Sequence, residues 1–237
     1  MSDESDPVTA VAKAVEESGK AVQEVAKTGR ALIEPGTELA NYVARMLGTV
    51  PEDVIGFLIG DPLHELRQHT LTGILRAVFE KLRKRGVETA KPIRPGPGKE
   101  AFEAASLETD ETLQDMWAEL LANAMDATKH MTLRKLLIDT LRKFEPADAL
   151  VFQKMGRQHV STSALPERAS VGGRLSISIL AEILKERETF IALAFDNLDR
   201  LRCIERGPTS KVAEKDQAIL TTLGIELYLS CTGDAPD

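Results

Sequence analysis

A stripe of polar side chains recurs every three or four residues along one segment of the chain. It consists of Asp115, Glu119, Asn123, Asp126 and His130, and this spacing places side chains on one side of a helix. Two carboxylates and an imidazole, here Glu119, Asp126 and His130, are groups that bind a divalent metal or perform acid–base catalysis. A metal-dependent hydrolase or nuclease centred on these three residues is therefore one hypothesis for the function.

The same stripe has a simpler interpretation, because carboxylates opposite an apolar face are typical of a solvated amphipathic helix. Metal sites usually draw ligands from several segments, and the sequence shows no partner cluster for this one. We therefore expect the stripe to face solvent, with no catalytic, cofactor-binding or metal-binding role.

The apolar residues of the same segment define the other side of the predicted helix. They follow the pattern i, i+3, i+4, i+7, i+8, i+11, i+12 and comprise Leu113, Met116, Trp117, Leu120, Leu121, Ala124 and Met125. This period predicts an amphipathic helix, and Asp110 is suited to cap its first turn. Trp117 lies within the apolar face, so we expect it in the core rather than in a ligand site.

Other catalytic signatures are missing from the sequence. There is no GxSxG, HExxH or CxxC motif, and no GxGxxG motif between a strand and a helix. The string "PGPGK" invites comparison with a phosphate-binding loop, which needs an earlier Gly at a fixed spacing and a Ser or Thr after the Lys. Ile93 and Glu100 occupy these two positions, so we exclude this kind of site.

A basic run closes a predicted helix just before Gly86 and comprises Lys81, Arg83, Lys84 and Arg85. Cations in a last turn, followed by glycine, are a common helix ending, because the cations complement the helix dipole. We expect this role for the run, and contact with an anionic membrane surface is the alternative.

Composition and charge limit the class of protein. The 237 residues are 43% hydrophobic but only 4% aromatic, so the core must be largely aliphatic, which favours packed helices. The net charge of −7 offers no bulk attraction for nucleic acid. No secretory signal or long apolar run is visible, and two cysteines are too few for a disulfide framework. We predict a mainly helical protein of the cytoplasm.

Five segments are predicted along the chain. Residues 1–91 form an N-terminal helical region whose first helix carries a narrow apolar seam, suited to pairing with another helix. Residues 92–99 are rich in Pro and Gly and form a linker. Residues 100–144 form a central helical motif, residues 145–231 a winged-helix-like domain and residues 232–237 a tail.

The winged-helix prediction rests on the order of elements after residue 145. Three helices are followed by a strand–turn–strand pattern at residues 203–221, the one place where we expect β-structure, and then by a closing helix. Arg187, Arg200 and Arg202 are the candidate DNA contacts, but acids accompany them along the third helix. Because DNA binding needs a local excess of cations, we expect protein contacts or self-association here, with a DNA-binding regulator as the alternative.

Four strings resemble the abortive-infection alpha (Abi-alpha) family of bacterial proteins. They are "ETLQDMWAELLANAMD", "LRKLLIDTLRKFEPADALVF", "FDNLDRLRCIE" and "ILTTLG", and the resemblance extends from about Pro95 to Cys231. The first string is a structural signature in this comparison, carried here by Leu113, Trp117, Leu120, Leu121, Asn123, Met125 and Asp126. The family often has His-Pro after this helix, whereas here Met131 follows His130.

The resemblance implies a bacterial cytoplasmic protein linked to phage defence by shutdown of the host cell. It implies no catalytic residue. The leading hypothesis is thus a non-enzymatic helical protein that acts through protein contacts and self-association.

Overall fold

The computed structural model describes residues 64–87, 90–91, 93–163, 174–207 and 216–232, and within these ranges the chain is mainly helical, as predicted. The predicted apolar seam near the N-terminus and the tip of the hairpin lie outside the described residues. Among the helices described, none combines the length and the apolar character needed to cross a membrane.

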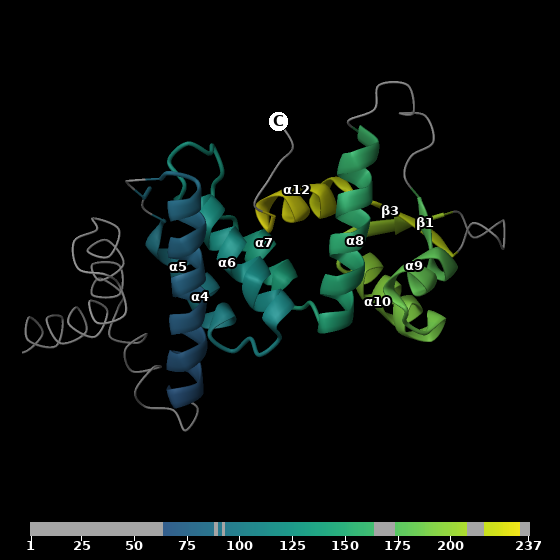
Figure 1. Ribbon diagram of the computed structural model, residues 1–237, viewed down its shortest axis with the longest axis horizontal. Coiled ribbons are helices and arrows are strands. Elements are labelled where there is room, and N and C mark those ends of the chain that lie inside the picture. The colour runs from purple at the N-terminus through teal and green to yellow at the C-terminus, as the bar shows by residue number, and fades with distance from the viewer. Residues whose placement is uncertain (1–63, 88–89, 92, 164–173, 208–215, 233–237) are drawn as a thin grey trace, which may run out of the picture.

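The first half of the described chain is a group of helices: α4 (His64–Lys84), α5 (Pro95–Ala105), α6 (Glu111–Met125) and α7 (Lys135–Leu141) (Figure 1). α4 packs along α6, and its residues Ile74, Val78 and Leu82 are all buried. The chain leaves α4 at Gly86, whose positive φ of 68° is the left-handed conformation that ends helices. Trp117 is 1% exposed, which confirms that it belongs to the core.

The predicted linker at residues 92–99 is helical from Pro95 onward, so this part of the prediction is wrong. Pro95 begins α5, and Ile93 just before it is buried. Proline fits the first turn of a helix because its missing N–H would have no intrahelical partner there. The Pro and Gly residues of this stretch therefore mark the start of a helix rather than a free connection.

The second half contains α8 (Pro146–Ser163), α9 (Ile177–Leu184), α10 (Glu188–Arg200) and α12 (Thr222–Ser230) with a small antiparallel sheet. The sheet has the order β1-β3-β2, built from β1 (Leu175–Ser176), β2 (Ile204–Arg206) and β3 (Gln217–Leu220). β2 and β3 are the predicted hairpin. β1 was not expected, because two residues are too short to show the alternation that predicts a strand. The element order is the one that suggested a winged helix, and that assignment stays a prediction.

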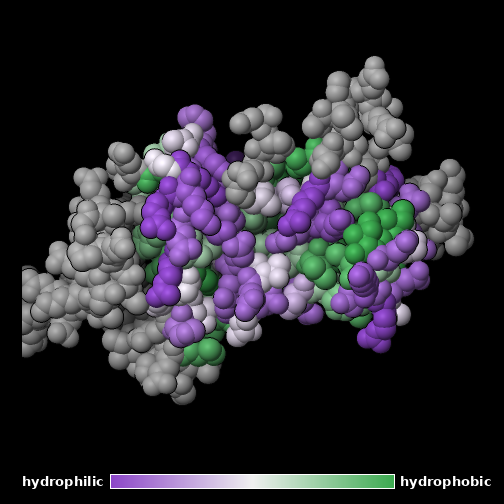
Figure 2. Space-filling model, in the orientation of Figure 1, coloured by the Kyte–Doolittle hydropathy of each residue, from purple (hydrophilic) through white to green (hydrophobic). Residues whose placement is uncertain are grey.

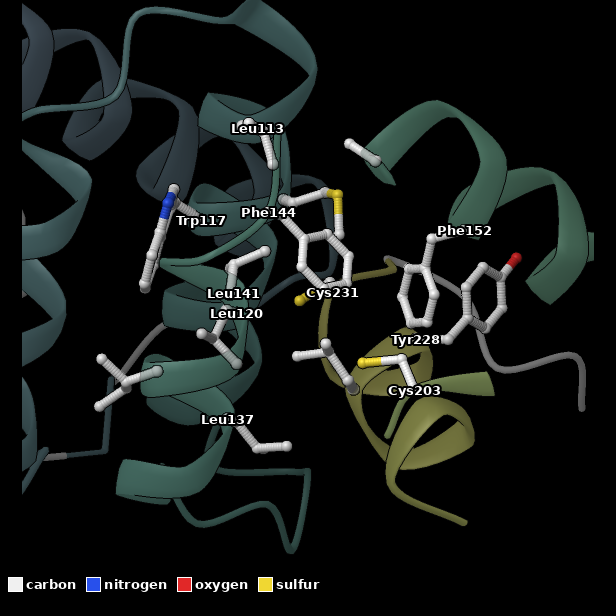
Figure 3. Close-up of a cluster of buried hydrophobic side chains, with 14 of the residues drawn as sticks. Leu113, Trp117, Leu120, Leu137, Leu141, Phe144, Phe152, Cys203, Tyr228 and Cys231 are labelled. Atoms are coloured by element: carbon white, nitrogen blue, oxygen red, sulfur yellow. The ribbon is translucent and has the colours of Figure 1, made fainter. Parts of the chain in front are cut away.

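α12 joins the two halves, because it packs against both α6 and α8. Phe144, Phe152 and Tyr228 form a row of edge-to-face aromatic rings across this junction, with centroids 5.2 Å and 6.2 Å apart (Figure 3). Gly156 of α8 lies directly against the Tyr228 ring, where a Cβ would come within 2.0 Å of a ring carbon. Only glycine therefore lets α8 and α12 approach this closely.

The string "ILTTLG" forms the end of β3 and the start of α12. The Thr221 hydroxyl accepts a hydrogen bond from Gly224 N at 3.0 Å and so caps the helix. Gly224 lies against the backbone of Cys203, just before β2, where a Cβ would be 2.0 Å from the Cys203 carbonyl oxygen. The spacing of Thr and Gly in this string thus serves helix capping and close packing.

Candidate functional site

Three members of the polar stripe are buried, so the prediction that the stripe faces solvent is wrong for them. Glu119, Asn123 and Asp126 are 7%, 1% and 1% exposed. They face the C-terminal end of α4, whose basic run supplies the partners. Asp115, at the outer end of the stripe, keeps 59% of its side chain exposed.

Two cations at the C-terminal end of α4, Lys81 and, one residue beyond the helix, Arg85, bind the carboxylates of α6. Lys81 Nζ lies 2.6 Å from Asp115 Oδ1 and 2.9 Å from Glu119 Oε1. Arg85 Nη2 forms an ion pair with the other Glu119 oxygen. Lys81 and Arg85 are four residues apart, and so are Asp115 and Glu119. Residues at this spacing lie on one side of a helix, so the two cations face the two carboxylates between α4 and α6.

The pKa of Lys81 reflects this position. Burial lowers the pKa of its amine, but the hydrogen bonds and charges of Asp115 and Glu119 outweigh burial, so the net shift is upward from the ordinary value. Lys81 therefore stays protonated at neutral pH. The cluster is an ion-pair network with its charges matched, rather than a group of free carboxylates.

Asn123 connects this network to the C-terminal end of α12. Its Oδ1 accepts hydrogen bonds from Arg85 Nη1 at 2.9 Å and Lys129 Nζ at 2.7 Å. Its Nδ2 donates to the carbonyl oxygens of Ser230 at 2.9 Å and Thr232 at 3.1 Å. Since an amide offers two donor hydrogens and two acceptor lone pairs, Asn123 uses all of its hydrogen-bonding capacity here.

Asp126 closes α6 and shapes the turn that follows. Its Oδ1 accepts from Thr128 N at 2.9 Å and Thr128 Oγ1 at 2.6 Å, while Arg85 Nη1 lies 3.9 Å from its Oδ2. His130 is exposed beyond this turn. Arg85 thus lies close to both Glu119 and Asp126. In the described part of the chain, no three His, Cys, Asp or Glu side chains are arranged to hold a metal ion.

The basic run of α4 has two different roles. Lys81 and Arg85 are half-buried against α6, whereas Arg83 and Lys84 are exposed. A contact with an anionic membrane surface would therefore rest on Arg83 and Lys84 alone. The sequence feature that could have predicted this cluster is the equal four-residue spacing of the two cations and of the two carboxylates. Neither the composition nor the usual pattern of helix ends takes this spacing into account.

A third buried carboxylate, Asp148, holds α10 to the start of α8. It is 2% exposed and accepts hydrogen bonds from Glu145 N at 2.8 Å and from Asn197 Nδ2. Burial raises the pKa of this carboxyl, although the two hydrogen bonds lower it in part. Asn197 also donates to the Lys143 carbonyl oxygen at 3.2 Å. The string "FDNLDRL" thus positions α10 in the fold.

The three candidate DNA contacts do not form one basic patch. Arg187 precedes the first residue of α10, while Arg200 and Arg202 lie at its other end, about 20 Å away at the usual helical rise. All three are exposed. Arg200 Nη2 donates to Asn197 Oδ1 at 2.5 Å. Asp196, between them on the exposed side of the helix, pairs with Arg206 of β2 at 2.7 Å.

Helix α9 carries exposed apolar side chains in the C-terminal half, although the sequence predicted it only as one of three helices. Six of its eight residues are apolar, but only Leu180 and Ala181 are buried. Ile179 and Ile183 are 47% and 46% exposed. We call this outer side of the helix the α9 face, and Figure 2 shows apolar residues gathered in this part of the C-terminal half.

The fold is thus a mainly helical one in which a buried polar cluster joins the beginning, middle and end of the described chain. The family model described as abortive infection alpha matches residues 67–231, and the chain belongs to this family. No curated protein and no solved structure matches the chain. The match covers both the polar cluster and the α9 face, and it supports a role related to abortive infection.

Proposed function

We propose that this protein is a non-enzymatic component of a phage-defence system that acts by binding another protein molecule through the α9 face. The observation that carries the proposal is that α9 packs against the core through Leu180 and Ala181 while Ile179 and Ile183, four residues apart on one side of the helix, stay about half exposed. Exposed apolar side chains that gather on one side of an element mark sites of protein contact, so the outer side of α9 fits a partner.

The polar cluster supports this proposal rather than an enzymatic one. The oxygens of Glu119 are engaged by Lys81 and Arg85, and Asn123 is fully engaged by its own chain. A general acid or base has to reach a substrate atom, and these groups instead reach from one helix to another. The chemistry of the stripe therefore serves the fold.

The experiment is a phage plating assay in a bacterial host that expresses the chain with its native genetic neighbours. We expect Ile183→Asp to abolish protection, because a charge on the α9 face opposes burial against a partner. Leu136→Asp on α7 is the matched control, since Leu136 is 57% exposed and lies outside α9. Equal protection by both variants, at equal protein abundance, would refute the proposal.

A further inference from the structure

We propose that the partner that covers the α9 face is a second copy of this chain, related to the first by a two-fold axis. This inference rests on the proposed function in using the same face, and it names the occupant. It is carried by the charges around the face.

The apolar centre of the face is small. It consists of Ile179 and Ile183, flanked by the partly buried Ile177 and Leu184. A helix of eight residues is about 12 Å long, so the area it offers belongs to the lower end of the size range of specific interfaces. We therefore expect association in the micromolar range of concentration rather than an obligate dimer.

The exposed charges of α9 and of the residues just before and after it, which we call the rim of the face, are balanced. The exposed charged residues from position 174 to position 188 are three cations and three anions, namely Arg174, Lys185, Arg187, Glu182, Glu186 and Glu188. A nucleic acid or an anionic membrane surface needs an excess of cations, which this rim lacks. A rim with equal numbers of both signs has no net repulsion for a copy of itself.

Two-fold symmetry makes such a rim self-complementary. In a two-fold interface, residue i of one copy meets residue j of the other, and j meets i in return. The cations just after α9, Lys185 and Arg187, can then face Glu182 and Glu186 of the other copy while the isoleucines meet at the centre. The whole chain carries a charge of −7, so two copies repel at long range and a neutral face is the favourable place for them to meet.

The first test is sedimentation velocity of the full chain across the micromolar range. We expect the mass of the wild-type protein to rise from 25.9 kDa toward twice that value with concentration. Ile183→Asp should raise the dissociation constant by roughly 100-fold, because the substitution occurs twice in a symmetric interface and lies at its centre. Leu136→Asp should associate like the wild type. A wild type that stays monomeric, or an Ile183→Asp variant that associates normally, overturns the proposal.

The second test places the interface directly and does not depend on a destabilising substitution. Ile179→Cys introduces an exposed thiol, whereas the native Cys203 and Cys231 are both buried. A short bis-maleimide should link two copies of Ile179→Cys covalently, and should link neither the wild type nor Leu136→Cys. Equal cross-linking of the Ile179→Cys and Leu136→Cys variants overturns the proposal.

The two proposals fail in different ways. If Ile183→Asp abolishes phage protection but the wild type is monomeric, the α9 face binds some other protein, so the proposed function survives and the second copy is refuted. If Ile183→Asp abolishes dimerisation but protection is unchanged, the dimer stands and the proposed function is refuted.

Discussion

Replacing Glu119 with Gln tests whether the polar cluster holds α4 against α6. The substitution keeps the size of the side chain and removes the charge between Lys81 and Arg85. The Glu119 side chain is 9% exposed, and those of Lys81 and Arg85 are 19% and 18% exposed, so water can replace the lost partner only in part. Breaking a buried ion pair costs about 3–5 kcal/mol. Because these cations are partly solvated, we expect Glu119→Gln to lower the free energy of unfolding by about 2–3 kcal/mol.

The assay is urea unfolding followed by circular dichroism and by tryptophan fluorescence. Trp117 is the single tryptophan of the chain and lies in α6, so its fluorescence reports on the helix that carries Glu119. Asp115→Asn is the matched control: this carboxylate also binds Lys81 but is 59% exposed, so its loss should cost less than about 1 kcal/mol. A loss for Glu119→Gln no larger than that for Asp115→Asn would refute the reasoning.

Four further outcomes follow from the packing and the charges. Trp117→Ala should lower the free energy of unfolding by about 3–5 kcal/mol in the same urea assay, and a loss below about 1 kcal/mol would place Trp117 at the surface. Gly224→Ala should cost about 2–3 kcal/mol or more, because its Cβ would overlap the Cys203 carbonyl oxygen, whereas Gly96→Ala has open space and should melt like the wild type. Burial raises the pKa of Cys203 from 9.0 to about 12, so the thiol ionises at lower pH in the unfolded chain than in the folded one. The free energy of unfolding should therefore fall as the pH rises through this window. The urea midpoint should fall less steeply with pH when Cys203 and Cys231 are both replaced by Ala. The C-terminal half should not bind duplex DNA below micromolar protein at physiological salt, and a steep salt-dependent mobility shift there would favour the DNA-binding regulator.

Helices with a strong apolar period could be predicted from the sequence. The segment from Glu111 to Met125 shows this best, because its core positions, its Asp110 cap and its buried Trp117 are all local features. The hairpin strands could also be predicted, because their strand–turn–strand pattern is a local feature of the sequence. The two-residue strand β1 could not, since it exists only by pairing with β3.

The polar cluster could not be predicted by the same reasoning, because it depends on contact between helices distant in the sequence. Taken alone, Asp115, Glu119, Asn123 and Asp126 fit a solvated face, and Lys81 and Arg85 fit a helix end. Each set acquires its role only when α4 lies along α6. The matched four-residue spacing of the two sets is the one local signal that linked them.

A buried ion-pair network is a weak source of net stability, because removing charges from water costs about as much as pairing them returns. Its better-supported use is to favour one register, since a shifted helix would bury charges without partners. Here the network fixes α4 against α6, and Asn123 extends it to the carbonyl oxygens at the end of α12. A substitution at Glu119 should therefore reduce phage protection only by lowering the amount of folded protein. A substitution at Ile183 should reduce phage protection while the fold stays intact, because that side chain is half exposed and lies outside the network. Measuring protection together with the abundance of folded protein separates the two, and only the second tests the function of the α9 face.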